Sequence, residues 1–113
     1  KQVLRSRRRK IRSDLIAKIA KENKFFIPCY ALQLDAVMYE NGDLFPCELL
    51  NKKVGNLRDY NYNFKAIWKS QQADEIRNYI RETKCYCTHE CNLSTNIFYN
   101  PKYFLKLLKK ESV

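Results

Sequence analysis

The sequence has 113 residues, of which 45% are hydrophobic, and its 22 Lys and Arg against 12 Asp and Glu give a net charge of +10. This length allows one domain with a modest core, and the apolar and aromatic content excludes a disordered chain. No apolar run is long enough for a membrane span and no signal peptide pattern opens the chain, so we expect a cytoplasmic protein that does not bind a membrane.

The first predicted element is a basic amphipathic helix over residues 3–22. Apolar residues recur along it at helical spacing: Leu4, Ile11, Leu15, Ile16, Ile19 and Ala20. Residues 1–24 hold ten Lys and Arg against two acidic residues, a net of +8, whereas residues 25–101 hold eight against nine, a net of −1. Such clustered cations bind polyanions, but they are more often the solvated face of a helix. We therefore expect a docking helix and consider nucleic-acid binding unlikely.

A β-hairpin is predicted next, around Asn41 and Gly42. Both residue types tolerate positive φ, and apolar runs flank them over 34–40 and 44–49. If the two residues form a two-residue turn, Cys47 lies opposite Ala36. The segment YALQ, residues 30–33, then has to fold back if Cys29 is to share a metal with Cys47.

Shorter elements follow the hairpin. We expect a short strand over 54–57, a polar turn over 58–63 and a short helix over 64–70. Ser70 is a good N-cap for a helix over 71–83. Its apolar stripe consists of Ala73, Ile76, Tyr79 and Ile80. Little regular structure is expected over 84–100, and Asn100 with Pro101 starts a last amphipathic helix over 101–110.

The cysteines are the chemically distinctive feature of the sequence. They lie at Cys29, Cys47, Cys85, Cys87 and Cys91, in the pattern C-x12-G-x4-C followed by C-x-C-x3-C. An odd number fits a disulfide framework poorly, and clustered thiolates in a reducing compartment more often hold a metal. Four thiolates from three segments suit a zinc ion or an iron–sulfur cluster, and the spacing does not choose between them. The only histidine, His89, is expected to form a hydrogen bond near the site and not to be a ligand.

The expected fold class is therefore α+β: a small β-hairpin and a cysteine knuckle around a metal cluster, flanked by amphipathic helices. This arrangement resembles the SPASM/twitch accessory region of radical S-adenosylmethionine (SAM) enzymes. The likeness runs from about residue 29 to 91. It rests on the pair Cys29 and Cys47 with Gly42 at a fixed place between them, on the I-W-x-S stretch at 67–70, and on the knuckle formed by the last three cysteines. With no cysteine after 91, it implies one auxiliary [4Fe–4S] cluster, as in the twitch variant, with zinc as the alternative or substitute metal.

The resemblance also implies the ligands and the partner. Cys29, Cys47 and Cys91 match cluster-binding positions. Cys87 is preferred as the fourth ligand because it lies four residues from Cys91, and Cys85 is the alternative or a spare thiol. Residues 1–24 would be the linker helix from an upstream radical SAM barrel of the same protein, 25–100 the cluster-binding domain and 101–113 the C-terminal helix.

The same resemblance limits what this chain does alone. The C-x3-C-x2-C signature of the SAM-cleaving cluster is missing, since Ser94 stands where the third cysteine would be needed. We expect SAM to bind only in the full-length protein, with no catalytic residue in this chain, and the substrate stays open. The alternative function is a zinc-stapled module that binds nucleic acid or another protein.

Overall fold

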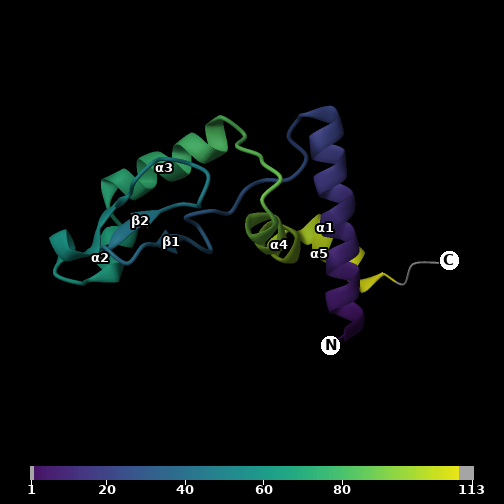
Figure 1. The fold of residues 1–113 in the computed structure, drawn as a ribbon, viewed down its shortest axis with the longest axis horizontal. Coiled ribbons are helices and arrows are strands. Elements are labelled where there is room, and N and C mark those ends of the chain that lie inside the picture. Colours follow the sequence, from purple (N-terminus) through teal and green to yellow (C-terminus); the bar gives the residue numbers. More distant parts are fainter. Residues whose placement is uncertain (1, 110–113) are drawn as a thin grey trace. The chain divides into compact units, whose positions relative to one another are not determined.

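The computed structural model describes residues 2–109, and Figure 1 traces their helices and short strands along the chain. Packing divides the chain into two compact units. The helical unit comprises the chain up to Cys29 and from Tyr86 onward, and the sheet unit comprises Tyr30 to Cys85. The helices and the small sheet confirm the α+β class. The predicted domain boundaries after residues 24 and 100 stay predictions, because a compact unit is not the same thing as an independently acting domain.

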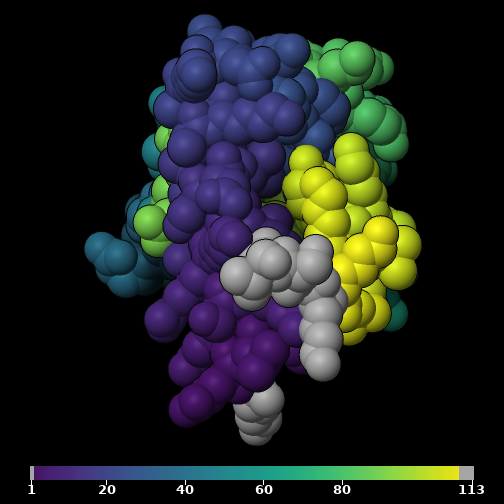
Figure 2. Space-filling model, turned by 90° about the vertical axis from the view of Figure 1, so that its right-hand side faces the viewer, coloured from purple at the N-terminus to yellow at the C-terminus, as the bar shows by residue number. Residues whose placement is uncertain are grey.

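The helical unit contains α1 (Gln2–Glu22), α4 (Glu90–Tyr99) and α5 (Pro101–Leu108). Figure 2 shows α5 lying along α1. Their shared core is apolar and consists of Leu15, Ile19, Ile27, Leu93, Ile97, Tyr103 and Leu107. The predicted stripe on α1 is thus only partly correct. Leu4 is 47% exposed, and Ala20 is exposed although its neighbour Ile19 is buried, so Ala20 lies off the face that packs into the core. None of the helices within 2–109 is long and apolar enough to cross a membrane.

The expectation of little regular structure over 84–100 is wrong, because α4 occupies most of it. Asn, Ser and Thr make this segment a poor helix former by intrinsic propensity. Leu93 and Ile97 lie four residues apart and are buried in the core with α1 residues, and Asn92 and Asn96 are buried as well. Tertiary packing of one face therefore makes the helix, as is usual for short helices in proteins.

The sheet unit begins with three antiparallel strands in the order β1 (Val37–Met38), β2 (Asp43–Phe45) and β3 (Gly55–Asn56). The predicted hairpin is present, but Asn41 and Gly42 do not form a two-residue turn. The Tyr39 amide donates to the Asp43 carbonyl at 2.9 Å, so the loop has three residues. Val37 pairs with Phe45, and continuing this register places Cys47 level with Asp35 instead of Ala36. The physical cause is Gly42 at φ +91°, which favours a three-residue loop.

Three helical elements complete the sheet unit. They are the 3-10 helix η1 (Leu57–Tyr60), α2 (Phe64–Trp68) and α3 (Gln71–Glu82). Ser70 caps α3 as predicted, its hydroxyl accepting from the Ala73 amide at 3.2 Å. Arg77 ties α3 to its surroundings by donating to the carbonyls of Leu32 and Trp68 at 2.7 and 2.6 Å. Tyr79 departs from the prediction, since it is 39% exposed beneath the Lys52 ammonium, 4.1 Å from its ring centroid.

Candidate metal centre

The Cys47 thiol lies just after β2 and is buried, with 7% of the residue exposed. The Leu50 amide donates to its sulfur at 3.2 Å. Hydrogen bonds of this kind stabilise negative charge on sulfur and adjust the potential of a bound cluster. The geometry at Cys47 therefore suits a thiolate ligand.

The hairpin loop before Cys47 is held by a polar network. The Asn56 side-chain amide donates to the Asn41 carbonyl at 3.0 Å and to the Asp43 carboxylate at 2.9 Å. Asn41 accepts from the Asp43 amide and donates to the Asp43 carboxylate, at 3.0 and 3.1 Å. The hydrogen bond from Asn56, assisted by Asn41 and by Lys53, holds the pKa of Asp43 below its ordinary value of 3.8. The contacts from Asn56 are long-range and are not revealed by the sequence, and together with the local Asn41 contacts they fix the start of β2, the strand that leads to Cys47.

The chain reverses directly after Cys29, as the prediction for YALQ requires. The Leu34 amide donates to the Tyr30 carbonyl at 3.0 Å, and the Leu32 amide donates to the Asp35 carbonyl at 2.7 Å. Leu32 adopts a left-handed conformation, with φ +64°. A turn is therefore present in this segment, and the metal that Cys29 and Cys47 would share stays a prediction.

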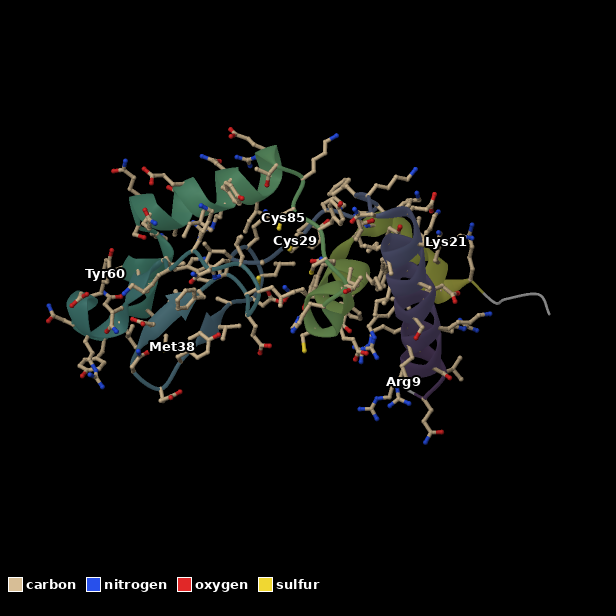
Figure 3. All side chains as sticks on the ribbon, turned by 45° about the horizontal axis from the view of Figure 1, so that its top comes forward. Arg9, Lys21, Cys29, Met38, Tyr60 and Cys85 are labelled. Carbon is tan, nitrogen blue, oxygen red and sulfur yellow. The ribbon has the colours of Figure 1, made fainter. Side chains whose placement is uncertain are left out.

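Cys85 is placed by the end of α3. The Cys85 amide donates to the Ile80 carbonyl at 3.0 Å and the Lys84 amide to the Arg81 carbonyl at 3.3 Å, with Lys84 at φ +49°. This is the Schellman arrangement that commonly closes a helix. Figure 3 shows Cys85 on the segment that follows α3, and Cys29 on the segment that follows α1. The helix end thus fixes the backbone of Cys85.

Tyr86 anchors the start of the knuckle inside the helical unit. Helix α1 ends at Glu22, and Asn23 follows at φ +50°. The Tyr86 hydroxyl donates to the Asn23 carbonyl at 2.8 Å. The residue before Cys87 is therefore tied to the segment that leads to Cys29, a contact that no sequence pattern indicates.

Cys91 lies exposed in the first turn of α4. The Arg12 guanidinium of α1 reaches this turn, since it donates to the Ser94 hydroxyl at 2.9 Å and lies 3.7 Å from the Glu90 carboxylate. Helix α1 thus contacts Glu90, directly before Cys91 in the sequence, and Ser94, three residues after it.

The five cysteines are divided between the units. Cys29, Cys87 and Cys91 belong to the helical unit, and Cys47 and Cys85 to the sheet unit. Within residues 2–109, no three Cys, His, Asp or Glu side chains gather closely enough to hold a metal ion. The predicted ligand set, including the choice between Cys85 and Cys87, stays a prediction. The chemistry of the donors fits a cluster, because all five cysteines carry free thiols and the Cys47 sulfur accepts a hydrogen bond from the Leu50 amide.

A family model for the SPASM iron–sulfur cluster-binding domain matches residues 29–92, more than half of the chain. The chain belongs to the SPASM family. The SPASM match begins at Cys29 and ends one residue after Cys91, so it spans every cysteine of the sequence. No curated protein and no solved structure matches the chain. The resemblance to the SPASM family is confirmed, and membership of this family implies iron–sulfur cluster binding.

Proposed function

We propose that the chain is the C-terminal accessory domain of a radical SAM enzyme and binds one auxiliary [4Fe–4S] cluster. The observation that carries the proposal is that the SPASM match begins at the first cysteine, Cys29, and ends one residue after the last, Cys91. When bound, such a cluster supplies one-electron chemistry, and its thiolate ligands, net charge and hydrogen bonds set its potential. The domain would either orient the substrate or pass electrons.

The ligands in this proposal are Cys29, Cys47 and Cys91, with Cys87 or Cys85 as the fourth. Cys47 contributes a buried thiolate whose charge the Leu50 amide stabilises. Cys91 contributes an accessible thiolate at the start of a helix, where backbone amides favour negative charge.

The partner in this proposal is an upstream radical SAM barrel of the same protein, reached through the basic helix α1. That barrel would bind and cleave SAM and determine the substrate. A cytoplasmic location accords with this chemistry, because reducing conditions keep the cysteine thiols available.

Anaerobic reconstitution with iron and sulfide tests the proposal directly. The parent chain is expected to hold about four iron and four sulfide, the content of one [4Fe–4S] cluster, and to lose its brown colour on reduction. Cys47→Ser should lose the cluster, whereas Cys85→Ser should keep it. If Cys85→Ser loses the cluster and Cys87→Ser keeps it, Cys85 is the fourth ligand. Uptake of zinc but no iron under anaerobic conditions would favour the zinc-stapled module instead.

Cys47→Ser should also loosen structure beyond the ligand, because metal-binding energy in such sites is also folding energy. Amide exchange should accelerate in the hairpin, in the turn after Cys29 and in the knuckle, while α3 and α5 keep much of their protection. A Cys47→Ser variant that retains both the cluster and a protected hairpin would exclude this ligand set.

A further inference from the structure

The first turn of α4 carries Cys91 but lacks the usual N-terminal restraint. His89 occupies the N-cap position and makes no side-chain capping hydrogen bond. A missing cap leaves backbone donors of the first turn without side-chain partners and typically costs about 1 kcal/mol of helix stability. The backbone around Cys91 therefore depends on contacts from elsewhere.

Arg12 of α1 contacts two side chains at this helix start; its guanidinium only donates hydrogen bonds, so it holds the side chains without capping the backbone amides. One guanidinium nitrogen donates to the Ser94 hydroxyl at 2.9 Å, and the other lies 3.7 Å from the Glu90 carboxylate. These two partners stand one residue before and three residues after Cys91. The guanidinium thus contacts side chains on both sides of Cys91 in the sequence.

The position of Arg12 is itself well determined. Three and seven residues further along α1, Leu15 and Ile19 are buried in one core with Leu93 and Ile97 of α4. Only 22% of the Arg12 side chain is exposed, compared with 69% for Glu90. A half-buried cation held by helix packing is less screened by water and salt than an exposed one. Its charge therefore acts on the start of α4 from a fixed place.

We propose that Arg12 is a positioning residue for Cys91, and that its charge makes the bound cluster easier to reduce. The second part rests on the proposed function, in which Cys91 is a cluster ligand. A cluster held by thiolates carries net negative charge once reduced, and nearby positive charge stabilises the reduced state. Ser94, which occupies the place of an absent cysteine in the sequence, has a structural function here as the acceptor for Arg12.

The experiment compares Arg12→Gln, Arg12→Lys and the control Arg9→Gln, which removes an exposed arginine from the same helix. Amide exchange of Leu93 is measured first in the metal-free chain, because its amide donates to the His89 carbonyl at 3.1 Å and closes the first turn. Exchange should be about two- to fivefold faster in Arg12→Gln, as expected for loss of a partly exposed ion pair. Arg9→Gln should match the parent.

The reduction potential of the reconstituted cluster is then measured by EPR-monitored titration. It should fall in Arg12→Gln and be largely restored in Arg12→Lys, which keeps the charge, whereas Arg9→Gln should leave it unchanged. Equal Leu93 exchange in Arg12→Gln and Arg9→Gln would overturn the positioning role, and equal potentials would overturn the electrostatic role. If the parent takes up no iron, the proposed function and the electrostatic role both fail, while the exchange result still decides the positioning role.

Discussion

Replacing Gly42 with alanine should destabilise the hairpin that leads to Cys47. Gly42 adopts φ +91°, a backbone conformation in which a residue with a side chain is strained. A Cβ at this position would also lie 3.0 Å from the Asn56 side-chain oxygen. Asn56 cannot shift without weakening its hydrogen bonds to Asn41 and Asp43. The substitution therefore combines backbone strain with damage to the polar network.

The expected cost can be assembled from these two contributions. A residue held in a rarely populated backbone region costs about 1–3 kcal/mol. Each weakened hydrogen bond adds about 0.5–1.5 kcal/mol. Since a rearranged loop relieves part of the strain, Gly42→Ala should lower the free energy of unfolding by about 2–4 kcal/mol, a large share of the stability of a small domain.

Urea unfolding of the metal-free, reduced chain measures this loss through the fluorescence of Trp68. Trp68 reports on the sheet unit, because its ring stacks on Phe64 with centroids 5.5 Å apart and lies 5.1 Å from the Arg77 guanidinium carbon. Glu40→Ala, an exposed change in the same loop, is the control and should cost less than about 0.5 kcal/mol. A Gly42→Ala cost no larger than the control would refute the reasoning.

Adding Asn56→Ala separates the two contributions. Without the Asn56 side chain there is no close contact at Gly42, so Gly42→Ala in that background should cost only the strain, about 1–3 kcal/mol. If Gly42→Ala lowers the free energy of unfolding equally in both backgrounds, the Asn56 side chain moves aside without loss of stability.

Three further outcomes concern pH, nucleic acid and SAM. Because the pKa of Asp43 is lowered in the folded chain, its stabilising contribution is complete above its ordinary value of 3.8 and is lost as the pH falls further. Urea midpoints of the parent and Asp43→Asn should therefore converge on acidification, and a constant difference would contradict this. Duplex DNA should bind weakly, without sequence preference and with steep loss in salt, by fluorescence anisotropy. Sequence-selective binding at physiological salt would favour the nucleic-acid alternative. The reconstituted chain should produce no 5′-deoxyadenosine from SAM above a no-protein control, and product formation would show an unrecognised SAM-cleaving site.

Much of the local structure and the family were predictable from the sequence. Helix α1 follows from its apolar spacing, and α3 from the Ser70 cap, whose hydrogen bond to the Ala73 amide spans three residues. The last helix follows from Asn100, whose side chain accepts from the Lys102 and Tyr103 amides. Signals of this kind lie within one turn of the chain and depend on little else. The SPASM family was likewise indicated by resemblance, through the cysteine pair with Gly42 between its members, the I-W-x-S stretch and the cysteine knuckle in the same order.

Tertiary structure decided the hairpin register and the knuckle. The loop at Gly42 is set with the help of Asn56, which bonds to the Asn41 carbonyl 15 residues away. Helix α4 exists because α1 covers Leu93 and Ile97, and Arg12 of α1 donates a hydrogen bond to Ser94, 82 residues further along the chain. Such contacts form only when packing brings distant segments together, and the chain entropy lost in doing so is compensated by the whole core. No local pattern encodes them, which is why the sequence did not predict α4 or the contacts of Arg12 with Glu90 and Ser94.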